Sequence, residues 1–242
     1  MNSSLMKKVR GFTLMETVIA IGVVAVLLTT FLAVLGPASQ SIRRSLSAQE
    51  ADRLQSALER ELQILREKTD SFDTAFEKAF DWILHSGEPK SMVLLYNYRG
   101  NPSDIRSDGS LEPYQGEDGQ SGRDFLLQSG VRRKGDADPL LEADLEVVEG
   151  QVYYVRMTQL VFENGTLKDG EHGSIVNPHE GDAYQDAKDY PEGTIAFRAD
   201  FFALKSNSLD YIQEIDLSDA NNDGRPDKLG LALFSRNLAV RR

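Results

Sequence analysis

The sequence predicts an α+β fold, in which a long amino-terminal helix precedes a head domain rich in antiparallel strands. An apolar stretch near the amino terminus continues as a helical stripe of leucines, whereas most apolar stretches after residue 90 are short and strand-like. Helix first and sheet later is typical of α+β proteins. The 242 residues allow one medium-sized domain with its own core beyond the first apolar stretch.

The first element is the apolar stretch from Phe12 to Leu35, which follows a short basic leader. Its 24 residues would form a helix about 36 Å long. The hydrocarbon core of a bilayer is about 30 Å thick, so this helix is long enough to span a membrane with some tilt. The core of a secretory signal is shorter and ends in a small-residue cleavage site, which residues 35–39 match poorly.

One carboxylate, Glu16, lies near the start of this apolar stretch. A charged side chain inside a bilayer costs several kcal/mol unless it is neutralised or paired, so such a residue is a candidate functional site. The alternative is a glutamate that extends its carboxylate to the membrane face and has no further role.

Residues 11–16 read Gly-Phe-Thr-Leu-Met-Glu. Together with the basic leader and the long apolar stretch, they resemble the cleavage and methylation motif of type IV prepilins and type II secretion pseudopilins. The resemblance covers about the first sixty residues. It implies that a prepilin peptidase cleaves between Gly11 and Phe12 and N-methylates Phe12. It also implies that Glu16 of one subunit meets the mature amino terminus of another.

The resemblance further implies a location and a set of partners. Residues 1–11 would lie in the cytoplasm of a bacterium, with a single pass through the inner membrane and the head in the periplasm or exterior. Basic residues normally concentrate on the cytoplasmic side of a membrane span. Here three basic residues precede the span and Arg43 and Arg44 follow it, so the distribution of charge supports this orientation only weakly. The implied partners are other pilin or pseudopilin subunits, the prepilin peptidase, an inner-membrane assembly platform and membrane lipid.

The overall charge is strongly acidic, with a formal net charge of −11. Removal of the leader would leave 24 basic and 38 acidic residues, a net charge of −14. Because this negative charge repels phosphate groups, we expect the electrostatic field of the protein not to favour binding to nucleic acid. The chain has no cysteine, so its redox compartment cannot be inferred.

The organisation predicted for the chain has four parts: a leader (1–11), a transmembrane and assembly helix (12–35), an amphipathic helix (36–68) and a β-rich head (69–242). Pro37 predicts a kink or break near Leu35. The apolar stripe of the amphipathic helix consists of Ile42, Leu46, Leu54, Leu58, Leu62 and Leu65. The resemblance implies that this helix packs on a sheet of the same chain, and a coiled-coil stalk is the alternative.

In the head, residues 70–84 predict a short helix whose aromatic residues lie in the core. The predicted strands are 91–98, 125–128, two within 145–162 joined at 149–151, 194–204, 211–217 and 229–240. Asn164 and Gly165 predict a tight turn. Residues 101–123 and 170–193 predict two long loops, because they are rich in glycine and acidic residues.

A candidate calcium loop follows the predicted strand 211–217. Oxygen-bearing residues alternate there before Gly224, as in the first half of an EF-hand loop, and the run resembles the calcium loops of dockerins and thrombospondin-type repeats. The twelfth position is Gly230 instead of a bidentate glutamate, which Asp216 would have to replace. An ordinary hairpin turn is the alternative. The predicted ligands are Asp219, Asn221, Asp223, Arg225 through its backbone carbonyl, and Asp227.

Catalysis finds little support in the sequence. His85, His172 and His179 are scattered, and no third ligand or nucleophile is suitably spaced. We therefore expect no enzyme, and the resemblance implies a structural subunit, a minor pilin or pseudopilin of a type IV pilus or type II secretion pseudopilus. The alternatives are an uncleaved, membrane-anchored extracytoplasmic binding module and an anchored hydrolase, which would need a clustered site in the fold.

Overall fold

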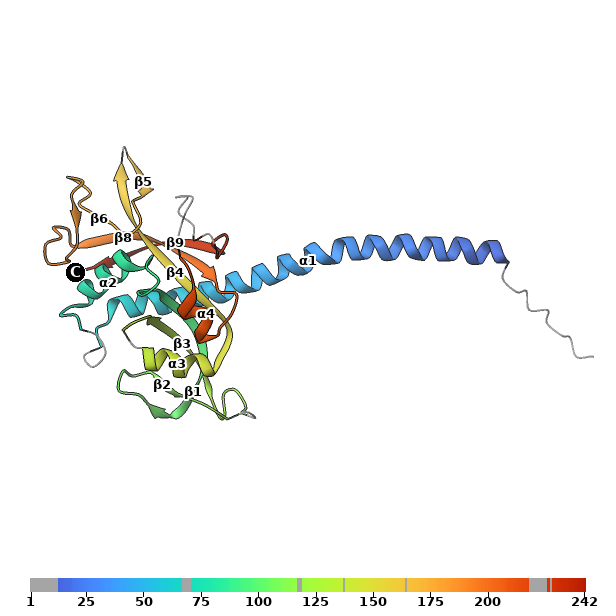
Figure 1. Cartoon of the computed structure of the whole chain (residues 1–242), viewed down its shortest axis with the longest axis horizontal. Helices are drawn as coiled ribbons and strands as arrows, with labels where there is room; N and C mark the ends of the chain where they lie inside the picture. Colours follow the sequence, from blue (N-terminus) through green and yellow to red (C-terminus); the bar gives the residue numbers. More distant parts are fainter. Residues whose placement is uncertain are drawn as a thin grey trace, which may run out of the picture. The chain divides into compact units, whose positions relative to one another are not determined.

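The computed structural model describes residues 13–66, 71–116, 119–136, 138–163, 165–217, 226 and 228–242. The chain divides into two compact units, Met1–Leu46 and Ser47–Arg242. Helix α1 (Leu14–Gln63) begins in the first unit and ends in the second. The second unit, the head, contains all other helices and strands that the described residues form (Figure 1).

The first unit consists of one apolar helix in its described part. From Leu14 to Leu35 the helix is long and apolar enough to cross a membrane, and its side chains have no partner within the unit that buries them. A kink or break was expected near Leu35; the break is wrong, because α1 continues through Gly36 and Pro37. Proline removes only one hydrogen bond of the ladder, and apolar spans tolerate it where small local adjustments satisfy the freed carbonyl.

The head is built on an antiparallel sheet of seven strands. Its central path runs β2-β1-β4-β8-β9, with β3 also paired to β1 and β5 to β4. A separate hairpin joins the short strands β6 and β7. The strands are β1 (Val93–Ile105), β2 (Leu111–Pro113), β3 (Leu126–Arg133), β4 (Val148–Glu163), β5 (Thr166–Asp169), β6 (Ile175–Val176), β7 (Ala183–Tyr184), β8 (Thr194–Ala203) and β9 (Phe234–Arg241).

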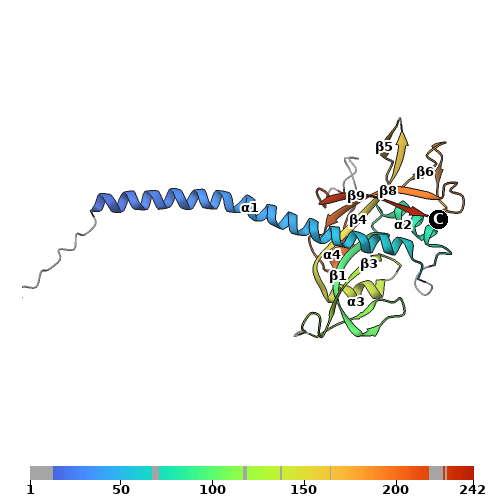
Figure 2. The same ribbon diagram turned by 180° about the vertical axis from the view of Figure 1, so that it is seen from behind.

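Both faces of the sheet carry helices, because successive side chains of a strand point to opposite faces. On the α1 face, Val93 and Leu95 of β1 pack in one core with the end of α1 and with α2 (Ala75–His85). On the α3–α4 face, Leu94 and Tyr96 pack with α3 (Asp138–Glu146) and α4 (Leu209–Glu214). The head therefore has three layers, which Figures 1 and 2 show from opposite sides.

The apolar stripe of α1 is confirmed only in its second half. Leu54, Leu58 and Leu62 are at most 1% exposed and belong to the core of the α1 face, as the resemblance to pilins implied. Ile42 and Leu46 are 60% exposed within this single chain. The helix ends at Gln63, before the predicted residue 68.

Several predicted elements are confirmed. Helix α2 corresponds to the predicted helix 70–84, and Phe76, Phe80 and Trp82 lie in the core. Strand β8 corresponds to the prediction for 194–204. The hairpin expected around residues 164–165 is confirmed by the pairing of Glu163 with Thr166, although Asn164 itself lies outside the described residues.

Other predictions were wrong. Residues 148–163 form one strand, because Gly150 lies in a bulge (φ +86°) and not in a turn. Residues 209–214 form helix α4 instead of a strand: the Ser208 hydroxyl accepts a hydrogen bond from the first turn, and Ile212 is buried.

The two predicted loops contain the end of β1, β2 and the β6–β7 hairpin. Strand 125–128 extends to Arg133, β9 begins only at Phe234, and α3 was not predicted.

Candidate functional site

The candidate assembly site lies at the start of α1, where Glu16 occupies the first turn. The backbone N–H of Thr13 donates to Oε2 of Glu16 (2.9 Å), and the Thr13 hydroxyl donates to the same oxygen (3.0 Å). The Glu16 backbone N–H in turn donates to the Thr13 hydroxyl oxygen (3.2 Å). This reciprocal arrangement is a capping box, which satisfies backbone N–H groups that the first helical turn leaves free.

Polar groups farther along the apolar helix are satisfied within the helix. The hydroxyls of Thr29 and Thr30 each donate to the carbonyl oxygen four residues earlier, at 2.8 Å. Such bonds leave no free donor toward lipid. Glu16 is the one ionisable side chain of the span Leu14–Leu35, and among the described residues its carboxylate forms hydrogen bonds only with Thr13.

The comparison with protein families bears on this segment. Residues 6–32 match the family model of the prokaryotic N-terminal methylation motif. The chain carries the type IV prepilin and pseudopilin signature. Searches of curated proteins and of solved structures gave no significant match.

The signature supports a pilin- or pseudopilin-like protein, and it implies a structural subunit that a prepilin peptidase processes. The apolar helix fits a single-pass membrane anchor. Gly11 and Phe12, the predicted cleavage position, lie outside the described residues but inside the matched segment. Glu16 lies inside it as well.

In the head, an ion cluster holds the end of α1. Glu61 bonds Nζ of Lys78 on α2 (2.6 Å) and the guanidinium of Arg66 (2.7 Å). The Arg66 guanidinium also donates to the backbone carbonyl of Asp108, in the β1–β2 connection. Burial alone would raise the pKa of Glu61, but the hydrogen bond from Arg66 and the charge of Lys78 lower it below its usual value.

The cluster continues through the edge of the sheet to α3. Arg132 of β3 bonds Asp108 (2.6 Å) and Asp144 of α3 (3.2 Å), and Asp144 also bonds Arg106 (2.6 Å). Burial alone would raise the pKa of Asp108, but hydrogen bonds from Ser110 and Arg132 lower it to about 2. We call Glu61, Arg66, Lys78, Arg106, Asp108, Arg132 and Asp144 the ion cluster.

The candidate calcium ligands Asp219, Asn221, Asp223, Arg225 and Asp227 lie outside the described residues. Asp216, the possible replacement for the missing glutamate, pairs with Lys228 at 3.3 Å.

Each of the three histidines contacts a different residue, and none of them contacts another histidine in the interactions described below. His85 pairs with Asp81 one helical turn away (3.0 Å), His172 bonds the Thr158 hydroxyl, and His179 lies 3.4 Å from a carboxylate of Glu192. Among the described residues, no three histidine or acidic side chains are placed to hold a metal ion. The folded chain does not bring the histidines into one site.

Sequence reasoning missed the capping box and the ion cluster. The capping box had a visible signal, since Thr13 and Glu16 have the spacing of the Thr-x-x-Glu pattern before an apolar run. The ion cluster had none, because its hydrogen-bonded side chains on β3, α3 and the β1–β2 connection lie 12 to 38 residues apart.

Proposed function

We propose that the protein is a minor pilin or pseudopilin of a type IV pilus or type II secretion pseudopilus. A prepilin peptidase cleaves it between Gly11 and Phe12 and methylates the new amino terminus. The inner membrane then holds it by its apolar helix, with the head in the periplasm or exterior, until it enters a filament through that helix. The single observation that carries this proposal is the match of residues 6–32 to the methylation motif.

The exposure of the apolar helix supports assembly through this segment. Large apolar side chains from Leu14 to Leu35 are between 48% and 86% exposed in the single chain. Such a surface requires lipid or other apolar helices around it. A membrane pool followed by helix-to-helix packing in a filament supplies both environments in turn.

Glu16 supplies the specificity in this proposal. Its carboxylate pairs with the methylated amine of Phe12 of a neighbouring subunit when the two helices are offset along the filament axis. The pairing removes the cost of an isolated charge in an apolar surrounding. The hydrogen bonds from Thr13 hold the carboxylate at the start of the helix.

The test separates the charge of Glu16 from its capping role. Glu16→Gln keeps an oxygen that accepts the Thr13 hydrogen bonds but removes the charge, whereas Glu16→Ala removes both. We expect both variants to be inserted and cleaved normally and to enter filaments much less than the natural chain, with Met15→Ala as the neighbouring control. Filament content is measured by immunoblotting of sheared filaments or cross-linked complexes, and normal incorporation of Glu16→Gln would refute the pairing.

The size of the head supports a minor subunit over the repeating major one. It contains about 196 residues and carries connections with their own small hairpins, which a tightly repeated subunit would have to accommodate at every step. Quantitative mass spectrometry of purified filaments tests this assignment, which predicts a small fraction of the major subunit's abundance.

Calcium binding by residues 219–227 remains a proposal from the sequence alone. If the loop binds calcium, the melting temperature of the head rises with calcium concentration and falls on addition of a chelator. Asp223→Ala would remove the dependence, and an unchanged melting temperature of the natural chain would refute it.

A further inference from the structure

Strand β3 forms a free edge of the main sheet. Arg99 of β1 donates its N–H to Val147 and accepts from the N–H of Tyr114, so odd-numbered residues of β1 direct their backbone groups away from β3. The even-numbered residues of β1 therefore bond β3, through pairs such as Tyr96 with Gly130. It follows that Leu127, Ser129 and Val131 direct their N–H and C=O groups outward. Within the described residues, no strand pairs with this side of β3.

The first six residues of this edge lack the charges, prolines and bulges that normally prevent pairing with other chains. Proteins protect free edges with charged residues, prolines, bulges or covering segments. The first six residues of β3, Leu126 to Val131, contain none of the charged residues or prolines, and their register with β1 is regular. Leu126 and Leu127 are 45% and 52% exposed. By contrast, the opposite edge strand β9 carries Arg236 and Arg241.

A groove of about 440 Å³ runs beside this edge, between β3 and the end of α1. Its lining includes backbone and side chains of residues 126–132, together with Ala57 and Ile64 on the α1 side. The groove lies within the head, next to the ion cluster. It offers room for the side chains of a strand added to β3.

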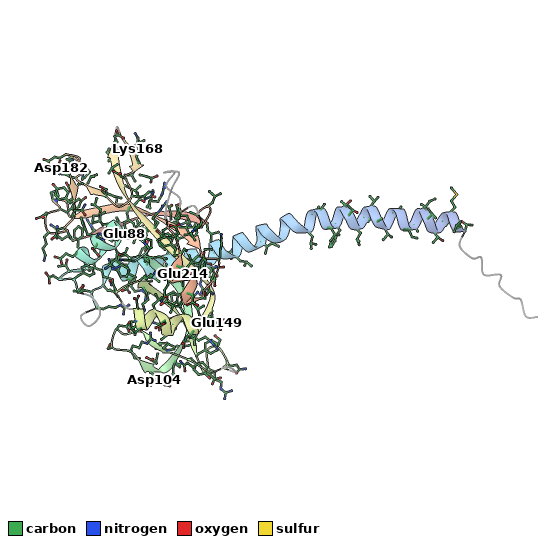
Figure 3. The ribbon with its side chains drawn as sticks, viewed as in Figure 1. Glu88, Asp104, Glu149, Lys168, Asp182 and Glu214 are labelled. Carbon is green, nitrogen blue, oxygen red and sulfur yellow. The ribbon has the colours of Figure 1, made fainter. Side chains whose placement is uncertain are left out.

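The charge of the groove differs from that of the rest of the head. Arg60, Arg66 and Arg132 line it with only one carboxylate, that of Glu61. Arg60 is exposed and forms no ion pair in the part of the chain that the structure describes. The remaining surface carries many exposed carboxylates on different elements, among them Glu88, Asp104, Glu149, Asp182 and Glu214 (Figure 3).

We propose that the free edge of β3 binds an extended, acidic segment of another polypeptide as an added strand of the sheet. The outward N–H and C=O groups of Leu127, Ser129 and Val131 supply the main-chain hydrogen bonds, and the groove receives alternate side chains. Arg60 at the groove selects acidic side chains. This interaction is additional to assembly through the amino-terminal helix, and its test does not depend on the proposed function.

The test uses the full chain in detergent and two synthetic probes. The first is a fluorescein-labelled peptide of about nine residues that alternates valine and glutamate, and the second has lysine in place of glutamate. Fluorescence anisotropy measures the affinity, and hydrogen–deuterium exchange reports protection of residues 126–133. We expect the acidic peptide to bind about tenfold or more tightly than the basic one and to slow exchange in β3.

Two pairs of variants locate the contact. Leu127→Pro removes one outward N–H without removing a bond to β1, and Leu127→Thr retains it. Arg60→Glu reverses the charge at the groove, and Arg53→Glu makes the same change on an exposed part of α1 that does not line it. We expect Leu127→Pro and Arg60→Glu to weaken binding of the acidic peptide about tenfold or more, with the two controls unchanged.

Three results would overturn the proposal. The first is the absence of binding of the acidic peptide up to millimolar concentration. The second is binding that neither Leu127→Pro nor Arg60→Glu weakens. The third is protection of residues 126–133 that rises with protein concentration in the absence of peptide, because the edge would then bind a second copy of this chain.

Discussion

The docking of α1 on the head can be tested by truncating Leu58, which is fully buried between the helix and the sheet. Leu58→Ala removes apolar atoms from the core and leaves a cavity that the surrounding sheet fills only partly. Buried Leu→Ala changes cost about 2–5 kcal/mol, and the complete burial of Leu58 leads us to expect about 3 kcal/mol. Alanine is a strong helix former, so this loss does not come from helix propensity.

The assay follows unfolding of the full chain in detergent by the fluorescence of Trp82, the single tryptophan of the chain and a core residue of α2. For a head of this size, about 3 kcal/mol corresponds to a decrease in melting temperature of about 6–12 °C. Leu46→Ala is the matched control, because it makes the same change on the same helix at a residue that is 60% exposed. We expect the control to change stability by less than about 0.5 kcal/mol. Equal effects of the two variants, or a loss below about 1 kcal/mol for Leu58→Ala, would refute the docking.

Three further predictions concern the edge of the sheet. Asp144→Ala removes the buried carboxylate that Arg106 and Arg132 share, so that each guanidinium keeps only its other partner, Glu112 or Asp108; it should lower the free energy of unfolding by about 3 kcal/mol in urea titrations. Gly130→Ala would place a Cβ 2.5 Å from the buried ring of Tyr96, and should lower the free energy of unfolding by about 1–3 kcal/mol in the same titrations. The pKa of Asp108 is lower in the folded chain (about 2) than its usual 3.8, so its carboxylate stabilises the head above about pH 4. This contribution of about 2 kcal/mol should be lost as the pH falls from about 4 to 2, and Asp108→Asn should abolish that part of the pH dependence of unfolding.

Local patterns predicted the fold where one periodicity dominated. The four-residue spacing of Leu54, Leu58 and Leu62 specified which side of the helix is buried, and the turn residues at 164–165 specified a hairpin. The prediction of a turn at Gly150 was wrong because a glycine with positive φ occurs in bulges as well as in turns. The three-residue spacing of the buried Ile212 and Ile215 would have indicated a helical turn, but their strand-forming side chains favoured a strand.

The candidate site also contains some features that the sequence predicted and others that it did not. The methylation motif and the apolar helix could be predicted because the residues that define them are contiguous in the sequence. The ion cluster and the free edge of β3 could not, because both depend on which distant segments the sheet brings together. Residues that pair over a long distance in the sequence leave no periodic pattern in it. Their charged side chains are also of the types that are mostly exposed to solvent, so nothing in the sequence marks them as buried.

The most direct test of the account is the amino terminus of the chain purified from cells that contain a prepilin peptidase. Tandem mass spectrometry of the amino-terminal peptide identifies the first residue and any methyl group on its amine. We predict Phe12 as the first residue, with one methyl group on its amine, and reduced cleavage in the variant Gly11→Ala. A chain that begins at Met1 in those cells would contradict the account and favour the uncleaved, membrane-anchored binding module.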